Sequence, residues 1–564
     1  MEKIWLRQYQ EGVPPEVDLS EYRSLKELLE KSCIRFGSLP AFTNMGTSIT
    51  YRELDRLALQ FAAYLQKELK LDKGTRVAIM MPNLLQYPVA LFGVLRAGMT
   101  VVNINPLYTP RELRHQLQDS GAEVILVLEN FAHTLEEALT GTAVRTVITT
   151  QVGDVLPRMK SCLVNFVVRR VKRMIPKWRI EGARRFRKVL QLGARQVLED
   201  IALGPEDTAF LQYTGGTTGL ARGAILTHGN VVANVLQTSA WIAGKLKKGA
   251  ETVVTPLPLY HIFSLTVNCM TFVREGANNV LITNPRDIPG FVKELKRTRF
   301  SVITGVNTLY KALLENPELK EVDTSRLKFA VSGGMAVQRS VAQRWQETMG
   351  VPLIEGYGMT ETSPVVSINP LNAVEFSGNI GLPIPSTEVS IRDEDDRELS
   401  TGQMGEICVR GPQVMKGYWN MPDETDRVVS RDGWFRTGDM GVIDEHGFVR
   451  LTDRKKDLVL VSGFKVYPNE VEDVLGMHDG VLECAVIGVP DEHSGEAVKA
   501  FVVRKDPNLT TEDLSAHCRK YLTGYKIPHF VEFLNEPLPK TNVGKVLRRA
   551  LRAAEAARRS TRAA

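Results

Sequence analysis

The sequence predicts an α/β protein with a large N-terminal domain, made of two α/β layered subdomains plus a small β-barrel, and a small α+β C-terminal domain. Three observations lead to this fold class. The chain has 564 residues, which is too long for one simple core. Two stretches alternate helical periods with short apolar runs, and a third is rich in short β-like pieces and turns. A highly charged strip then precedes the last part of the chain.

The first α/β subdomain begins with an amphipathic helical stretch that runs to Leu69. Short apolar runs follow at residues 76–81, 90–95 and 124–128. Such alternation is typical of βαβ units around a parallel sheet. The same rhythm predicts the second subdomain, whose short apolar runs are residues 252–255, 279–282, 301–304 and 329–332.

The small β unit is expected in residues 387–439, where short β-rich pieces alternate with Gly, Pro and Asp turns. The charged strip DRKKD, residues 453–457, lies between two apolar strands and is the expected interdomain hinge. We therefore divide the chain into an N-terminal domain of residues 1–452 and a C-terminal domain of residues 453–564.

Composition narrows the class of protein. Hydrophobic residues make up 43% and charged residues 24%, which is usual for globular proteins. The first residues resemble no signal peptide, and no apolar run is long enough to span a bilayer, so we expect a cytoplasmic protein. The six cysteines and nine histidines form no metal-binding pattern, so any metal is expected to be an oxygen-ligated ion that arrives with a phosphate substrate.

A basic segment covers residues 158–188, with twelve Lys or Arg against the single acid Glu181. Its apolar residues fall at helical spacing and predict an apolar stripe beside a basic face; they are Val164, Val167, Val168, Val171 and Met174 or Ile175. Reversible contact with an anionic membrane surface is one interpretation, and a solvated basic face or a nucleic-acid patch is the other. A net charge of only +6 argues against a dedicated nucleic-acid protein.

The sharpest motif is YTGGTTGLARG at residues 213–223, between two apolar runs. Its glycines let consecutive backbone N–H groups face one concavity, and Arg222 adds positive charge, which together suit a polyphosphate. It is not a Walker A loop, because no GK[ST] follows at the required spacing. An ordinary glycine-rich hairpin loop is the alternative.

A second motif, EGYGMTE, occupies residues 355–361. Tyr357 can offer a flat face to a base, Thr360 a hydroxyl to a phosphate, and Glu361 a carboxylate oxygen to Mg²⁺. A strand-to-helix turn with Thr and Glu as helix caps is equally consistent with the pattern.

Two further motifs each contain one candidate residue. Asp439 ends GWFRTGD, where it can accept hydrogen bonds from both ribose hydroxyls, although a lone Asp in a Gly turn is more often structural. Lys545 ends PKTNVGK, where it can neutralise charge that builds on a phosphate, although most lysines are simply solvated.

These four motifs, in this order and with the DRKKD strip before the last, resemble the adenylate-forming enzyme superfamily. Further stretches are similar to the bacterial long-chain fatty acid CoA ligases, over nearly the whole chain; they are PLYHIF at 258–263, TNPRDIPG at 283–290, TGVNTLY at 304–310 and VSGFKVYPNEVEDV at 461–474. The resemblance implies a mobile C-terminal domain that rotates about Asp453 between two half-reactions.

The resemblance also implies roles for single residues. Those implied to bind ATP are Thr214, Gly215, Gly216, Thr217, Thr218, Gly333, Gly334, Met335, Glu355, Gly356, Tyr357, Gly358, Thr360, Asp439 and Arg454. Thr214 and Glu361 would hold Mg²⁺, and Gly463, Phe464 and Lys465 would lie beside coenzyme A. Lys545 and Arg222 would act on the phosphates, and His261 would line the acyl site. Arg222 departs from the family, which usually has lysine there.

In the implied reaction, a long-chain fatty acid and ATP first form acyl-AMP and pyrophosphate. The acyl group is then transferred to CoA. The alternatives are a fatty acyl-AMP ligase, which stops at the adenylate, and a non-catalytic lipid-binding protein on the same fold. The expected location is the cytoplasm, peripherally at the inner face of the cell membrane. Oligomeric state does not follow from the sequence, and a homodimer is left open.

Overall fold

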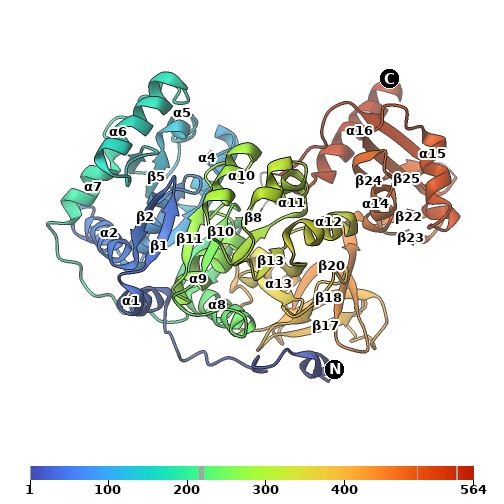
Figure 1. The fold of residues 1–564 in the computed structure, drawn as a ribbon, viewed down its shortest axis with the longest axis horizontal. Coiled ribbons are helices and arrows are strands. Elements are labelled where there is room, and N and C mark those ends of the chain that lie inside the picture. The colour runs from blue at the N-terminus through green and yellow to red at the C-terminus, as the bar shows by residue number, and fades with distance from the viewer. Residues whose placement is uncertain (1, 215–220, 492, 542–543, 564) are drawn as a thin grey trace.

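A computed structural model describes residues 2–214, 221–491, 493–541 and 544–563 (Figure 1). The strands form four sheets. Two large, mainly parallel sheets make the body of the molecule, a small antiparallel sheet lies beside them, and the fourth sheet belongs to the separate C-terminal lobe at the right of Figure 1. The predicted α/β fold class is confirmed.

The first α/β subdomain is an eight-stranded sheet. Its strands are, in spatial order, β19 (Gly417–Tyr418), β9 (Arg222–Thr227), β8 (Thr208–Thr214), β4 (Thr100–Asn103), β3 (Arg76–Met80), β5 (Val124–Leu128), β6 (Thr146–Thr150) and β7 (Arg184–Arg185). The predicted apolar runs at 76–81 and 124–128 are β3 and β5. The run at 90–95 lies instead in helix α3 (Gln86–Arg96), which is buried on every side and therefore shows no polar face in the sequence.

The second α/β subdomain is a nine-stranded sheet. Its strands are, in spatial order, β16 (Leu382–Pro383), β15 (Val365–Ile368), β14 (Leu353–Gly358), β13 (Phe329–Ser332), β12 (Val302–Gly305), β10 (Thr252–Thr255), β11 (Asn278–Leu281), β1 (Pro40–Asn44) and β2 (Thr47–Thr50). All four apolar runs predicted for this subdomain are strands of it. β10 to β14 are parallel, so their carboxyl ends meet at one edge of the sheet.

Helices cover both large sheets. They are α1 (Leu25–Phe36), α2 (Tyr51–Ala63), α4 (Pro110–Ser120), α5 (Ala132–Ala138), α6 (Arg158–Phe166), α7 (Phe186–Gly193), α8 (His228–Ile242), α9 (Phe272–Arg274), α10 (Ile288–Arg297), α11 (Asn307–Leu314), α12 (Arg339–Met349) and α13 (Pro422–Val428), besides α3. Several begin where the sequence supplies a cap. Thr50, Thr109 and Thr227 each accept a hydrogen bond from the backbone N–H three residues on, and the residue there bonds back to the threonine N–H.

The small β unit is a four-stranded antiparallel sheet of β17 (Glu388–Arg392), β18 (Gly405–Arg410), β20 (Phe435–Ile443) and β21 (Val449–Arg454). The last pair brings Asp439 opposite Arg454. GWFRTGD runs from the preceding turn into β20 and DRKKD begins at the end of β21, so the pairing of these strands brings the two motifs together.

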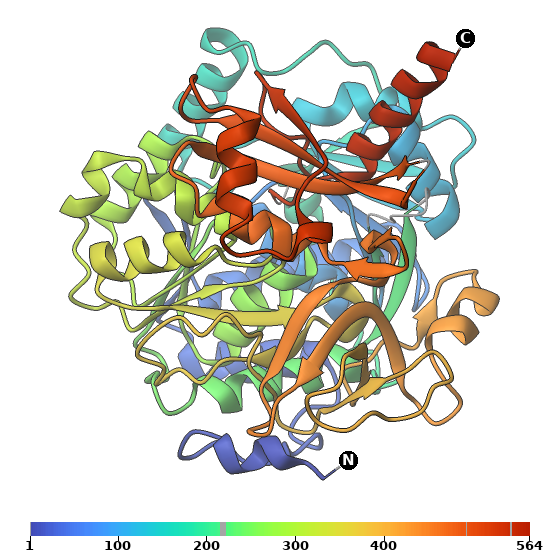
Figure 2. The ribbon, with the colours of Figure 1, turned by 90° about the vertical axis from the view of Figure 1, so that its right-hand side faces the viewer.

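The C-terminal lobe begins after β21 and faces the viewer in Figure 2. Its strands are β22 (Val459–Val461), β23 (Phe464–Val466), β24 (Val481–Asp491), β25 (Gly495–Arg504) and β26 (Phe530–Leu534). Its helices are α14 (Pro468–Gly476), α15 (Thr511–Cys518) and α16 (Arg548–Ala563). Buried side chains on both faces of β24 and β25 give this lobe its own core.

The basic segment contains α6 and one π-helical turn, η4 (Val167–Val171). Of the predicted apolar stripe, Val164, Val167 and Val168 are half-buried, whereas Val171 and Met174 are exposed. The exposed apolar side chains of the segment are Met159, Leu163, Phe166, Val171 and Met174. Within the described ranges, no helix is both long and apolar enough to cross a membrane.

Candidate active site

A cleft of about 2560 Å³ is lined by the carboxyl ends of the second sheet, the small β unit and the C-terminal lobe. Most predicted site residues line it. They are Thr214, Arg222, His261, Gly333, Gly334, Met335, Glu355, Gly356, Tyr357, Gly358, Thr360, Glu361, Asp439, Arg454 and Lys545. Gly215, Gly216, Thr217 and Thr218 fall outside the described residues.

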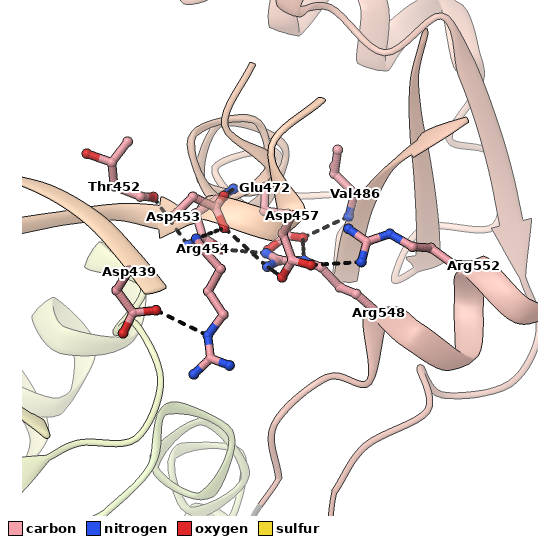
Figure 3. A network of polar contacts seen from close by, with 10 residues as sticks. Asp439, Thr452, Asp453, Arg454, Asp457, Glu472, Val486, Arg548 and Arg552 are labelled. Carbon is pink, nitrogen blue, oxygen red and sulfur yellow. Dashed lines mark hydrogen bonds and ion pairs between the residues drawn. The ribbon is translucent and has the colours of Figure 1, made fainter. Parts of the chain in front are cut away.

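Asp439 is the centre of one polar group in this cleft. The Tyr357 hydroxyl donates a hydrogen bond of 2.6 Å to Asp439 Oδ2. Arg454 Nε lies 3.3 Å from Asp439 Oδ1 (Figure 3). The aspartate is buried, so two partners on opposite oxygens fix its direction. The two carboxylate oxygens of Asp439 are therefore fixed in position at the cleft, where they can accept hydrogen bonds from two neighbouring hydroxyls.

Glu361 is the centre of a second polar group. Its Oε1 accepts a hydrogen bond of 2.7 Å from the Tyr418 hydroxyl. Arg222 lies over the Tyr418 ring, with its guanidinium carbon 5.5 Å from the ring centre, and makes a 2.9 Å ion pair with Glu424. Tyr418 reaches Glu361 and Arg222 because β19 pairs with β9, which brings Tyr418 opposite Ala224.

The Glu361 group has the chemistry of a magnesium site. Carboxylate and hydroxyl oxygens are the ligands that Mg²⁺ prefers, with substrate phosphates supplying others. Thr214 supplies a hydroxyl at the end of β8, which neighbours the turn η7 (Thr360–Thr362) that carries Glu361. Burial raises the pKa of Glu361, and the Tyr418 hydrogen bond opposes this rise by favouring the carboxylate. The residues present therefore fit a magnesium ion bound together with a polyphosphate.

The carboxyl ends of β13 and β14 form the floor between these two groups. Gly333 lies close to the neighbouring strand β14, since a Cβ on Gly333 would lie 3.2 Å from the Gly356 carbonyl oxygen. A Cβ on Gly358 would lie 2.1 Å from the Pro364 oxygen, so only glycine fits. Burial raises the pKa of Glu355 to about 8, and its Oε1 accepts a 3.3 Å bond from the Val337 N–H.

Lys545 enters the cleft from the C-terminal lobe. Its segment turns back on itself, with the Thr541 N–H donating to the Lys545 oxygen at 2.7 Å and the Lys545 N–H to Thr541 Oγ1 at 3.1 Å. The segment lies against α11, because a Cβ on Gly544 would lie 2.4 Å from Thr308 Oγ1. Burial and then the charge of Arg454 lower the pKa of Lys545 to about 8, while Asp439 favours the ammonium form.

His261 lines the cleft at the turn after β10. Burial, assisted by the charge of Lys545, lowers its pKa to about 4, so the imidazole is neutral at neutral pH. Its Nδ1 faces the Phe263 N–H at 3.4 Å. A neutral ring beside Lys545 suits an apolar boundary of the cleft better than a binding site for an anion.

An apolar arm leads away from these polar groups. One wall consists of alternate residues of β12 and β13, which are Val302, Thr304, Phe329 and Val331. The other wall consists of helical residues, which are Thr238, Trp241, Ile242, Val267 and Phe272. Most belong to one buried apolar cluster with Ile368 and Leu371. The cleft therefore joins a charged chamber to a channel suited to a hydrocarbon chain.

The charged strip 453–457, the expected hinge, is held by Arg548, three residues beyond Lys545 (Figure 3). Arg548 lies 2.7 Å from Glu472, 3.4 Å from Asp457 and 3.5 Å from Asp453. Asp453 also accepts a 2.7 Å hydrogen bond from the Asn469 N–H. The segment that carries Lys545 is thus tied to the body of its lobe and to the hinge strip at the same point.

Gly463, Phe464 and Lys465 do not line the cleft in this arrangement. Gly463 lies with Ser462 in the two-residue turn between β22 and β23, where both have positive φ as a type I′ hairpin turn requires, and Phe464 and Lys465 begin β23. Phe464 is exposed and stacks on Tyr525 with ring centres 4.9 Å apart.

Residues 29–419 match the AMP-binding enzyme family, and residues 470–545 match the AMP-binding enzyme C-terminal domain. The chain belongs to the AMP-binding enzyme family. The chain is 58% identical to a long-chain-fatty-acid–CoA ligase of Yersinia pestis over 552 residues, which cover 98% of each protein. A Haemophilus influenzae protein of the same name is 53% identical, covering 99% of this chain and 100% of its own. The resemblance to adenylate-forming enzymes, and to bacterial long-chain fatty acid CoA ligases among them, is confirmed.

A solved structure of a CoA ligase also superposes on the chain. It is an anthranilate CoA ligase in complex with anthranoyl-AMP, with a TM-score of 0.84 at 25% identity, covering 96% of this chain and 100% of its own.

Sequence reasoning missed Tyr418, which lines the cleft, and Glu424, which pairs with the cleft residue Arg222. Tyr418 and Glu424 lie in no motif, and their partners Glu361 and Arg222 are distant in sequence. The one signal available was the isolated GYW at residues 417–419, which gives no indication of its partner strand.

Proposed function

We propose that the chain is a long-chain fatty acid CoA ligase that uses ATP and Mg²⁺ and forms acyl-CoA, AMP and pyrophosphate. One observation carries the proposal: a single cleft joins an apolar arm to a chamber that holds Lys545, Asp439 and Glu361. The long-chain-fatty-acid–CoA ligases that are more than half identical to the chain support the same activity.

In the first half-reaction the fatty carboxylate attacks the α-phosphorus of ATP. The bond from that phosphorus to the bridging oxygen breaks, and pyrophosphate leaves with the electron pair. Lys545 neutralises the charge that builds at the α-phosphate, and Asp439 accepts hydrogen bonds from the ribose. Glu361 and Thr214 would hold Mg²⁺, which supplies charge neutralisation on the phosphates when bound. Arg222 contacts the departing phosphates from β9.

In the second half-reaction the thiol sulfur of CoA attacks the acyl carbonyl, and AMP leaves. A thiol with a pKa of about 8.5 already carries some thiolate at neutral pH, so no strong base is needed. We infer that residues 453–564 rotate as one domain against residues 1–452 between the two steps. This rotation withdraws Lys545 and brings Gly463, Phe464 and Lys465 to the cleft, which explains why both sets cannot line it together.

Two alternatives are testable in the same assay. A fatty acyl-AMP ligase would release or store the adenylate and make no thioester with CoA. A non-catalytic lipid-binding protein would exchange no pyrophosphate, but the retention of Lys545 and Glu361 in the cleft argues against it. The deciding experiment supplies ATP, Mg²⁺, CoA and carboxylic acids from acetate to oleate and measures acyl-CoA. If no acid supports exchange of labelled pyrophosphate into ATP, the proposed function is wrong.

We also infer reversible contact with anionic membrane surfaces through the basic segment 158–188. Met159 is 88% exposed, Leu163 63% and Phe166 58%, beside basic side chains of the same segment. Each Lys or Arg near an anionic leaflet adds about 1 kcal/mol of attraction. Vesicle binding should therefore require anionic lipid and weaken with salt. Binding that is indifferent to salt would contradict this electrostatic account.

A further inference from the structure

Aromatic side chains are among the residues that line the apolar arm far from Lys545. The arm follows β13 from Gly333 back to Phe329, a distance of about 13 Å at the usual rise of a strand. On the opposite wall, Thr238, Trp241 and Ile242 lie on one face of α8, since they are three and four residues apart. α8 ends at Ile242 and β12 begins at Val302, so these residues and Phe329 mark the end remote from Lys545.

Trp241 is the largest of these side chains and is fully buried. Its indole N–H donates a hydrogen bond of 3.2 Å to the Asn369 oxygen, which fixes the direction of the ring. One face of the residue lines the arm, and behind it lies the N-terminal segment of the chain.

The N-terminal segment forms a strap across the outside of Trp241. The strap consists of η1 (Ile4–Gln8), Tyr9 and Gln10. The Tyr9 ring meets the Trp241 ring edge-on, with centres 5.2 Å apart and planes at 86°. Gln10 Nε2 donates to the Trp241 carbonyl oxygen at 2.5 Å, and Gln10 Oε1 accepts from the Leu371 N–H at 2.9 Å. The strap therefore joins two walls of the arm, α8 and the segment after β15.

The strap is anchored at its ends and crosses the surface between the units. Trp5 is buried against the β20–β21 turn, where a Cβ on Gly447 would lie 2.5 Å from Trp5 Cα. The Tyr9 hydroxyl donates 2.6 Å to the Pro383 oxygen. Figures 1 and 2 both show this blue segment along the lower edge of the molecule. Neither Tyr9 nor Gln10 lines the cleft, so the strap acts on the arm only through the residues it holds.

We propose that Trp241 is the end wall of the acyl arm, that it sets the longest fatty acid accepted, and that Tyr9 and Gln10 are the positioning residues that hold it. The inference rests on the proposed function. A chain that reaches Trp241 can extend further only if the indole moves, and the strap opposes that movement. The N-terminal strap thus takes part in chain-length selection although it touches no substrate.

The test compares kcat/KM for saturated acids of increasing length in the wild type and four variants. Trp241→Leu should raise kcat/KM for the longest acids relative to the shortest by about tenfold or more, because one accommodated methylene changes discrimination by roughly 10- to 200-fold. Tyr9→Leu and Gln10→Ala should shift the ratio in the same direction by a smaller factor. Val302→Met, which adds length inside the arm, should shift it toward shorter acids.

A control is Leu19→Ala, at an exposed position that follows the strap in the sequence. It should leave the length profile unchanged. A variant that retains activity on the shortest acid is folded. If Trp241→Leu loses this activity, the length profiles of Tyr9→Leu and Gln10→Ala test the inference instead. A uniform loss at every length, with the ratio unchanged, would overturn the inference and leave the strap as a stabiliser of the fold. If the wild type activates no acid, it is the proposed function that has failed.

Discussion

Arg548 Nη1 lies 3.5 Å from Asp453 Oδ1, and this contact joins the expected hinge to the segment that carries Lys545 (Figure 3). Asp453 is buried, and burial raises its pKa while Arg548 opposes that rise by favouring the carboxylate. The expected hinge residue is thus held by its side chain, whereas the proposed rotation would change its backbone. Predictions can separate these two roles.

Replacing Asp453 with Pro should impair CoA transfer and spare adenylate formation. Proline fixes φ near −65° and so prevents the backbone change that rotation requires. The matched variant Asp453→Ala removes the contacts to Arg548 and Asn469 but leaves the backbone free, so it should retain transfer. Thioester formation from supplied acyl-AMP is the measurement. Normal transfer of the acyl group to CoA in Asp453→Pro would show that residue 453 is not the hinge.

Replacing Arg548 with Ala should loosen the C-terminal lobe. The change leaves Glu472, Asp457 and Asp453 close together without their shared cation, and loss of one partner of a buried pair costs about 3 to 5 kcal/mol. Hydrogen exchange of the β22 and β25 amides measures the free energy of opening. Arg552→Ala removes only the 2.8 Å pair with Asp457 and should cost less. Equal effects of both variants would contradict a central role for Arg548.

Replacing Lys545 with Ala should abolish adenylate formation and spare much of the thioester step from supplied acyl-AMP. The reason is that its ammonium lines the cleft in the arrangement described, while the proposed rotation withdraws it before CoA attacks. Pyrophosphate exchange and thioester formation are measured separately. Lys520→Ala, at an exposed lysine of the same lobe, should change neither step. Equal loss of both steps in Lys545→Ala would refute the assignment.

The sequence motifs predicted the charged chamber well because each is contiguous. EGYGMTE places Tyr357 and Glu361 by itself, and β20–β21 pairing then brings Asp439 to Arg454. Tyr418 could not be predicted, since it reaches Glu361 only through pairing of a two-residue strand with β9. The end of the apolar arm could not be predicted for the same reason. Trp241 lies in α8 and Phe329 in β13, far apart in the sequence, and no periodicity along the chain connects them.

The helix α3 and the basic segment show a second limit. A helix that is buried all round has no polar face, so its apolar run resembles a strand. In the basic segment the spacing indicated helix correctly, but which apolar face is turned to solvent depends on tertiary contacts. Val164 packs against the core, whereas Leu163 beside it is exposed.

Replacing Tyr418 with Phe should weaken Mg²⁺–ATP binding. The variant removes the 2.7 Å hydrogen bond that holds the Glu361 carboxylate, and a bond to a charged group contributes about 1.5 to 3 kcal/mol. The apparent KM for Mg²⁺–ATP in pyrophosphate exchange should therefore rise by roughly ten- to hundredfold, and excess Mg²⁺ should restore part of the rate. Glu361→Gln should lose the rate without rescue by Mg²⁺. An unchanged KM in Tyr418→Phe would separate Tyr418 from the metal site.

The depressed pKa of Lys545 predicts a pH dependence of the first half-reaction. Its amine is charged below a pKa of about 8, so the charge needed for adenylation is present at neutral pH and is lost as pH rises through that value. kcat/KM for ATP in pyrophosphate exchange, which reports the free enzyme, should fall about tenfold per pH unit above it. Lys545→Arg keeps its charge throughout this range, so whatever exchange activity it retains should not show the fall. A wild-type profile that stays flat to pH 10 would mean that the Lys545 charge does not govern the step.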